Sequence, residues 1–377
     1  MNTTIPDQTY SDFSLRLFRK ATISQHPLRG QIELTYKCNI RCVHCYTDCH
    51  NNPEDVQKEL PFEEVIRLLD QIYEAGCLWL LLTGGEIFMR KDFFHIYEYA
   101  KKKGFLVTLF TNATMITPEI ADRLEANPPF SIETSCHGGT AEVFERITQV
   151  PGSFRRFVEG VHLLLDRGLP LKIKTKAMTL NRSRLQEIKQ LVEGFGLRFR
   201  LSTAIYPDLK GSGQPLAYRL TPAEIVELEL GSQDLEDEED GCLDHDKSGE
   251  GICQDPPKAL YRCGCGTNTF IINPYGKLGS CVWTRQPEID LGGPFSEALE
   301  RLFHAIRSLT YRTASPCGSC RIFTLCAKNP GAAIPETGDR EQAVEHFCNV
   351  AHLKARRLGL DVYSPFEKGG GNGGPEG

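Results

Sequence analysis

The sequence between residues 31 and 45 reads QIELTYKCNIRCVHC. Its first part, residues 31–35, is a short apolar run that predicts a strand. The loop after it holds Cys38, Cys42 and Cys45 in the spacing C-x3-C-x2-C. Three thiolates this close together can bind three irons of a [4Fe-4S] cubane and leave the fourth iron open. An open position is typical of a metal site that binds a substrate, whereas structural metal sites are closed.

Strand and helix patterns alternate from this segment to about residue 207. Short apolar runs predict six strands, at residues 31–35, 78–82, 105–110, 130–134, 171–176 and 199–203. Amphipathic stretches between them predict five helices, at residues 61–75, 92–103, 117–125, 153–167 and 183–195. Right-handed connections would curl such a sheet into a partial (β/α)6 barrel of the TIM type, with its site at the carboxyl ends of the strands. The predicted fold class is therefore α/β.

Composition excludes several classes of function. The net charge is -6, and no stripe of Lys and Arg interleaved with aromatic residues is present, so we do not expect a nucleic-acid partner. No stretch of eighteen apolar residues is present, so we expect no membrane span. The chain has 15 cysteines in short, clustered spacings, which favours metal ligation in a reducing compartment over disulfides. We therefore predict a cytoplasmic protein.

A second motif follows the second predicted strand: Thr83, Gly84, Gly85 and Glu86. Two glycines let a backbone approach a ligand closely, and a carboxylate pairs with an ammonium group. With the cysteine triad on the neighbouring strand, this resembles the radical S-adenosylmethionine (SAM) superfamily. The resemblance implies that SAM chelates the open iron and that the Gly-Gly-Glu element contacts its amino group. A zinc knuckle or an isolated structural cluster is the alternative for the triad.

Other residues are assigned by the same resemblance, from strand order. Polar residues at the ends of the middle strands would bind the ribose and carboxylate of SAM, namely Thr111, Asn112, Ser135, and Lys174 or Lys176. Each of them has an ordinary alternative as a turn, a cap or a solvent-facing residue. His137 is interpreted as a polar surface residue, and Tyr46 either packs over the cluster or fills core. Cys49 is not expected to be a ligand, because a fourth thiolate would close the iron that SAM needs.

The last third of the sequence is rich in cysteine and resembles the SPASM extension of radical SAM enzymes, which holds two auxiliary [4Fe-4S] clusters. The resemblance assigns Cys317, Cys320, Cys326 and Cys348 to the distal cluster. A structural zinc site is the alternative for these four residues. A hairpin is predicted beside them, with strands at residues 270–272 and 279–282 around the turn at residues 273–276.

The proximal auxiliary cluster would take Cys265 and Cys281, with Cys263 next in order. The family pattern places a further cysteine at position 330, where this chain has Pro330. Either this cluster has three thiolates and an open iron, or Cys263 or Cys253 supplies the fourth. Cys77 and Cys136 lie next to apolar strands and are predicted to be buried small hydrophobes, and Cys242 has no assigned role.

These patterns divide the chain into five predicted parts. They are an N-terminal lead-in (1–30), the radical SAM core (31–220), a helix at 222–230 with an acidic connector (221–262), the SPASM domain (263–365) and a disordered Gly-rich tail (366–377). Only about thirty residues precede the first strand, which is too few for the leader-recognition domain of many peptide modifiers. A separate recognition protein is therefore expected, unless none is needed.

The resemblance implies reductive cleavage of SAM to a 5′-deoxyadenosyl radical that abstracts hydrogen from a substrate. We expect the substrate to be a ribosomally made precursor peptide that is crosslinked, epimerised or oxidised, and the electron donor to be a flavodoxin or ferredoxin. The alternatives are an oxidoreductase or decarboxylase acting on a small molecule such as a tetrapyrrole, and an iron-sulfur carrier that does not cleave SAM. Glu133, Tyr206 and Asp208 are expected near a cavity, but no catalytic acid or base is assigned.

Overall fold

The strands form one open, curved sheet in a computed structural model that describes residues 9–47, 51–231, 259–261, 263–312 and 315–366. The strands are β1 (Arg29–Thr35), β2 (Trp79–Gly84), β3 (Leu106–Phe110), β4 (Ser131–Ser135), β5 (Leu171–Lys176), β6 (Leu201–Ser202), β7 (Thr269–Ile272), β8 (Lys277–Gly279) and β9 (Ile289–Asp290). Their order is β6-β5-β4-β3-β2-β1-β7-β8-β9. The first six are parallel neighbours in chain order, as the sequence predicts.

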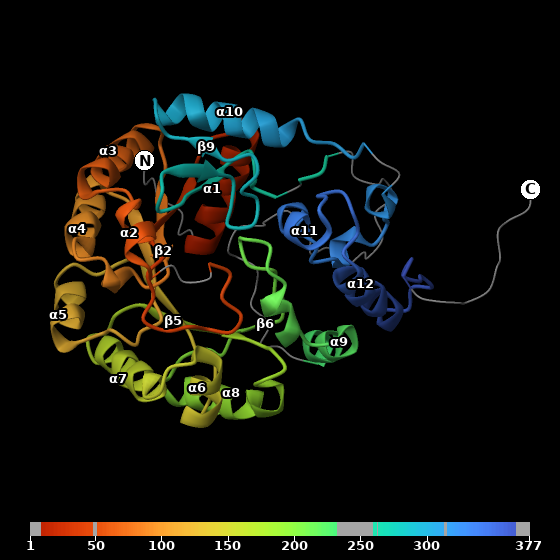
Figure 1. Cartoon of the computed structure of the whole chain (residues 1–377), viewed down its shortest axis with the longest axis horizontal. Helices are drawn as coiled ribbons and strands as arrows, with labels where there is room; N and C mark the ends of the chain where they lie inside the picture. The colour runs from red at the N-terminus through yellow and green to blue at the C-terminus, as the bar shows by residue number, and fades with distance from the viewer. Residues whose placement is uncertain (1–8, 48–50, 232–258, 262, 313–314, 367–377) are drawn as a thin grey trace, which may run out of the picture.

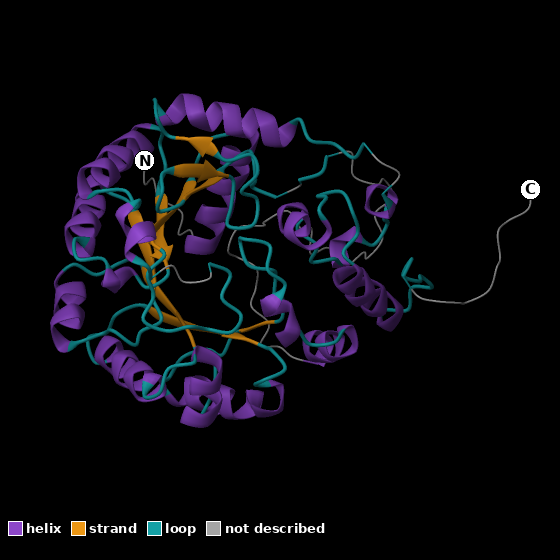
Figure 2. Ribbon diagram, viewed as in Figure 1, coloured by secondary structure: helices purple, strands orange, loops and turns teal. Residues whose placement is uncertain are grey.

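Helices cover the outer face of this sheet. The α-helices are α1 (Tyr10–Ser24), α2 (Pro53–Gln57), α3 (Phe62–Glu74), α4 (Phe93–Lys103), α5 (Pro118–Ala126), α6 (Ala141–Thr148), α7 (Ser153–Leu165), α8 (Leu185–Gly194), α9 (Pro222–Gly231), α10 (Phe295–Arg307), α11 (Pro330–Thr337) and α12 (Glu345–Arg357). Figure 1 shows α3, α4, α5, α7 and α8 as an outer arc, with α11 and α12 beside its open side. The strands lie inside the arc (Figure 2). The predicted partial barrel is therefore confirmed.

The sheet continues past β1 into the cysteine-rich part of the chain. β7 pairs parallel with β1, and β7, β8 and β9 form an antiparallel extension. Gly30 makes this pairing possible, because a Cβ there would lie 2.4 Å from the Phe270 ring. The hairpin prediction is confirmed, but its second strand is β8 at Lys277–Gly279 and not residues 279–282. One hydrophobic core therefore runs from α3 through the sheet to α10.

The N-terminal lead-in contains a helix, α1, that packs on the start of the sheet. The Phe18 ring stacks on Trp79 with centroids 5.3 Å apart, and the Trp79 indole N–H donates to the Tyr10 hydroxyl at 2.8 Å. Phe13 of α1 is exposed, whereas Phe18 and Ala21 are buried. The helix therefore adds a small apolar cluster, separate from the main core, beneath β1 and β2.

Two ion pairs fasten α11 and α12 to the barrel. Arg219 makes a bidentate pair with Glu336 of α11, at 2.7 and 2.8 Å. Lys354 of α12 pairs with Glu229 of α9, which also accepts a hydrogen bond from Thr203. Both ion pairs join residues that are far apart in the sequence. They therefore hold the C-terminal helices against the open side of the barrel.

Several predictions fall on residues outside the described ranges. They concern Cys49, Cys242, Cys253, the acidic connector at residues 234–255 and the Gly-rich end of the tail at 369–377. The division of the chain into domains stays a prediction, although the hydrogen-bonded sheet crosses the expected border between the core and the SPASM part.

Candidate iron-sulfur and SAM site

The Gly-Gly motif fits β2 against the backbone of the cysteine loop. Gly84 has φ +138°, and a Cβ on it would lie 2.1 Å from the carbonyl oxygen of Thr35. A Cβ on Gly85 would lie 2.2 Å from the carbonyl oxygen of Lys37. The amide of Gly85 donates to Thr35 at 2.8 Å and that of Glu86 to Lys37 at 2.7 Å. The two glycines therefore allow two backbones to meet just before Cys38.

The three thiols of the first cluster, Cys38, Cys42 and Cys45, lie close to one another. Burial raises the pKa of the Cys42 thiol, and the neighbouring Cys45 and Cys38 thiolates raise it further. A polar group faces each sulfur: the Asn112 amide donates to Cys38 Sγ at 3.7 Å, and the Thr47 hydroxyl lies 3.2 Å from Cys45 Sγ. His137 Nε2 lies 3.8 Å from Cys42 Sγ. Hydrogen bonds to cysteine sulfurs help to set the reduction potential of an iron-sulfur cluster, so these groups suit thiolate ligands.

His137 is a buried neighbour of the triad and not a surface residue, so its sequence-based interpretation was wrong. Its side chain is 5% exposed, and its ring meets the His44 ring edge-on, with centroids 4.8 Å apart. Burial is the main cause that lowers the pKa of His137 to about 4, and Lys176 adds to it. The imidazole is therefore neutral at physiological pH and can donate one N–H.

Glu86 is a fully buried carboxylate beside the triad. Its carboxylate accepts hydrogen bonds from the Thr111 hydroxyl at 2.8 Å and from the backbone N–H of Asn112 at 2.7 Å. It also caps the short helix η1 (Ile87–Met89). Burial raises its pKa to about 7, although these hydrogen bonds lower it. Thr111, Asn112 and Glu86 therefore form one polar group at the ends of β2 and β3, next to Cys38.

The remaining SAM candidates lie on β4 and β5. Ser135 is exposed at the end of β4, and Lys174 pairs with the buried Glu133 at 2.8 Å. The Lys174 ammonium also lies 5.4 Å from the centre of the Phe110 ring. Lys176 donates to the Ser202 hydroxyl at 2.7 Å. These residues share the carboxyl end of the sheet with the triad, in the place that the strand order predicts.

A buried ion pair that the sequence did not reveal joins β1 to the loop after β8. Glu33 is 0% exposed and makes a bidentate pair with Arg285, at 2.8 and 3.0 Å. The hydroxyls of Tyr36 and Tyr46 donate to the same carboxylate at 2.6 and 3.2 Å. Tyr46 directly follows Cys45, so this network ties the cysteine loop to the C-terminal part. Full hydrogen bonding is what makes a buried charge pair tolerable.

The seven described C-terminal cysteines proposed as ligands form two groups. Cys263 and Cys281 lie beside Cys265, whose pKa they raise more than its burial does. The second group consists of Cys317, Cys320, Cys326 and Cys348, and its members interact with one another. Burial is the main cause that raises the pKa of Cys326 to about 12. Cys77 and Cys136 are buried outside both groups, as predicted.

All four cysteines of the second group line one cavity of about 360 Å³. Its other walls include apolar side chains such as Ile322, Val344, Ala351 and Val362, together with Arg321, Lys328 and His352. Among the described residues, no fourth thiol joins the first group, and at position 330 Pro330 begins α11. Within the described ranges, no three or more His, Cys, Asp or Glu side chains are grouped tightly enough for a single metal ion.

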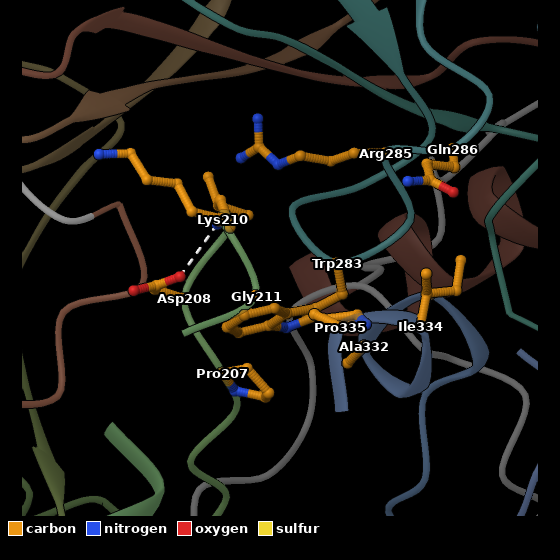
Figure 3. Close-up of a pocket in the computed structure, with 12 residues that line it drawn as sticks. Pro207, Asp208, Lys210, Gly211, Trp283, Arg285, Gln286, Ala332, Ile334 and Pro335 are labelled. Carbon is orange, nitrogen blue, oxygen red and sulfur yellow. Dashed lines mark hydrogen bonds between the residues drawn. The ribbon is translucent and has the colours of Figure 1, made fainter. Parts of the chain in front are cut away.

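A smaller cavity of about 210 Å³ lies between the cysteine loop after β1 and the C-terminal part of the chain. Its walls are the loop at residues 207–211, the loop at 283–286 and helix α11 (Figure 3). Asp208 shapes the first loop by accepting from the backbone amides of Lys210 and Ser212, at 2.9 and 2.8 Å. The amide of Leu209 donates to the carbonyl of Tyr46 at 2.8 Å, so the cavity begins one residue from Cys45.

An open parallel barrel with a three-cysteine loop after β1 and Gly-Gly-Glu at the end of β2 defines a class of enzyme. Residues 32–193 match the radical SAM superfamily. This part of the chain is a radical SAM domain, a kind of domain that implies one [4Fe-4S] cluster and SAM as cofactors. None of the helices in the described ranges is both long and apolar enough to span a bilayer.

Among characterised proteins, the chain is similar to the antilisterial bacteriocin subtilosin biosynthesis protein AlbA of Bacillus subtilis, with 25% identity over 74% of this chain and 60% of AlbA. It is also similar to the AdoMet-dependent heme synthase of Methanosarcina barkeri, with 34% identity over 43% of this chain and 45% of that protein. It thus spans less than two thirds of each. Streptococcus suis SuiB bound to the precursor peptide SuiA shares the fold, with TM-score 0.65, 16% identity and coverage of 91% of this chain and 82% of SuiB.

Proposed function

We propose that this chain is a cytoplasmic radical SAM peptide maturase that binds its catalytic cluster through Cys38, Cys42 and Cys45. The observation that carries the proposal is the polar group facing each of the three sulfurs, from Asn112, His137 and Thr47. When bound, the reduced cluster and SAM supply a 5′-deoxyadenosyl radical that abstracts hydrogen. Glu86, Asn112, Ser135 and Lys174 are the residues that would hold SAM.

Two auxiliary [4Fe-4S] clusters are part of the proposal. The 360 Å³ cavity lined by Cys317, Cys320, Cys326 and Cys348 supports a distal cluster with four protein thiolates. The grouping of Cys263, Cys265 and Cys281, with proline at position 330, supports a proximal cluster with three. These clusters would take up the electron that remains after hydrogen abstraction, and a flavodoxin or ferredoxin would deliver the first electron.

A precursor peptide is the proposed substrate, because the relative AlbA acts in bacteriocin biosynthesis and the SuiB fold accommodates a precursor peptide. A separate recognition protein would deliver the peptide if one is needed. The heme synthase relative supports a second candidate, a tetrapyrrole substrate, through its 34% identity in the aligned part. The two candidates differ in which compound stimulates SAM cleavage.

The test is 5′-deoxyadenosine release by anaerobically reconstituted, dithionite-reduced protein. We expect Cys42→Ala to lower the release at least a hundredfold, and the matched control Cys77→Ala, which removes a buried thiol outside the triad, to leave it within twofold. A peptide that raises the release more than a tetrapyrrole supports the maturase; the reverse supports the second candidate. Equal release by the parent and Cys42→Ala would contradict the radical SAM assignment of this loop.

A further inference from the structure

The 210 Å³ cavity of Figure 3 lies between the triad of Cys38, Cys42 and Cys45 and the group of Cys263, Cys265 and Cys281. On one side, Trp283 touches Tyr46, which follows Cys45, with ring centroids 5.5 Å apart. On the other side, the amide of Thr284 donates to Cys281 Sγ at 3.3 Å. Hydrogen abstraction needs contact between the substrate and the cofactor. Because the cavity adjoins the cysteine loop, a substrate group bound in it would lie close to the site of the reaction.

The wall around Trp283 is fixed before any ligand arrives. The Tyr206 ring lies 4.4 Å from the Trp283 ring and is itself held by its hydroxyl, which donates to the carbonyl of Ala327 at 3.1 Å. Helix α11 closes against the same residue, because a Cβ on Gly331 would lie 2.3 Å from the Trp283 carbonyl oxygen. A rigid wall lowers the ordering cost of binding.

The chemistry of the walls selects the ligand. Figure 3 shows Trp283 together with Pro207 and Pro335 on one side, and Lys210 and Arg285 across from them. Rings pack well on the flat faces of tryptophan and proline, and a cation over the opposite face of an aromatic ring adds attraction. An anionic group gains less from Arg285, because Glu33 already balances its charge.

The size of the cavity limits what it can hold. About 210 Å³ is below the roughly 300–1,000 Å³ of a pocket for a drug-sized ligand, so it suits one side chain rather than a whole small molecule. We infer that the cavity bounded by Trp283, Pro335 and Lys210 is a specificity pocket for one aromatic side chain of the substrate peptide. The inference rests on the proposed function for its substrate.

The test uses ¹⁹F NMR of the reconstituted full chain labelled with 5-fluorotryptophan. The chain has two tryptophans, so Trp79, which is buried under α1, serves as an internal control. N-acetyl-phenylalaninamide should shift the Trp283 resonance in a saturable way, leave that of Trp79 in place, and bind at least tenfold more tightly than N-acetyl-glycinamide or N-acetyl-leucinamide. Trp79→Phe assigns the two resonances.

Filling the cavity provides the matched variant. Ile334→Phe adds a ring at a half-buried position of the wall and should weaken binding of the phenylalanine amide at least tenfold, whereas Leu358→Phe at an exposed position should not change it. Equal shifts with the glycine or leucine amide, or unchanged binding in Ile334→Phe, would overturn the pocket. Binding of the phenylalanine amide without SAM cleavage would support the pocket and contradict the proposed function. SAM cleavage without such binding would support the proposed function and contradict the pocket.

Discussion

At the scale of single residues, the site depends on contacts between side chains far apart in the sequence. The cysteine spacing was readable from the sequence, and in the structure the three thiols are neighbours. The hydrogen-bonding partners of those sulfurs could not be predicted from the sequence, because no local pattern shows that the loop after β4 returns over Cys42. His137 was interpreted as a surface residue for this reason, and the Glu33–Arg285 pair, which joins residues 252 positions apart, went unnoticed.

His137 should tune the cluster held by the triad. A thiolate can only accept a hydrogen bond, so neutral His137 would donate its Nε2–H to Cys42, and donors to sulfur make a cluster easier to reduce. We predict that His137→Phe lowers the ratio of reduced to oxidised cluster about tenfold at a fixed potential, equal to about 59 mV for one electron. An EPR-monitored titration of SAM-free protein measures this.

The conservative variant His137→Gln keeps an N–H donor and should restore much of that ratio. Iron content serves as the control, because a donor to sulfur tunes a cluster without being one of its ligands. Equal potentials in the parent and His137→Phe would show that His137 only fills space.

Glu86 should make stability depend on pH. Burial raises its pKa to about 7, above the value of 4.5 for an unperturbed glutamate, so the folded protein keeps the proton longer than the unfolded chain. The stabilisation is complete below pH 4.5 and is lost as pH rises through 7. We predict that the parent loses about 1 kcal/mol of unfolding free energy between pH 6 and 8 that Glu86→Gln does not lose. Urea denaturation at both pH values tests this; parallel losses in both proteins would contradict it.

At the scale of elements, the sequence predicted the six parallel strands and the helices between them, because apolar spacing is a local property. It missed the short helix α6, the strand β9 and the pairing of β7 with β1 that joins the predicted hairpin to the sheet. That extension depends on the fit of Phe270 over Gly30, which no local window contains. The Gly-Gly motif was interpreted as space for a ligand, and in the structure it is also the place where β2 meets the cysteine loop.

Substituting Gly84 should separate these two elements. Gly84→Ala would place a Cβ 2.1 Å from the Thr35 carbonyl, whereas Gly104, also at positive φ, has nothing within 4 Å. Gly104→Ala should lower the free energy of unfolding by about 1–2 kcal/mol, from the backbone conformation alone. Gly84→Ala should cost at least about 2 kcal/mol more, because backbone must move to relieve the overlap. Comparable unfolding free energies for the two variants would contradict this prediction and show that the cysteine loop moves easily to relieve the overlap.

At the scale of the whole molecule, the Glu33–Arg285 pair couples the cysteine loop to the C-terminal part. Arg285→Met alone leaves a buried carboxylate without its partner and should cost about 3–5 kcal/mol. The double variant Glu33→Gln/Arg285→Met removes both charges and should cost less than Arg285→Met. Denaturation of the parent, the single variants and the double variant measures this coupling; additive effects would show that the pair is not a link.

The central claim is that one chain carries a SAM-binding cluster and two auxiliary clusters. Iron and acid-labile sulfide counted in anaerobically reconstituted protein test it most directly, with the variant in which Cys38, Cys42 and Cys45 are all alanine as the comparison. We predict about twelve irons in the parent and about eight in the variant, since each cubane holds four. A parent value near four, with zinc in the protein, would contradict the auxiliary clusters and leave a radical SAM enzyme with a structural zinc domain.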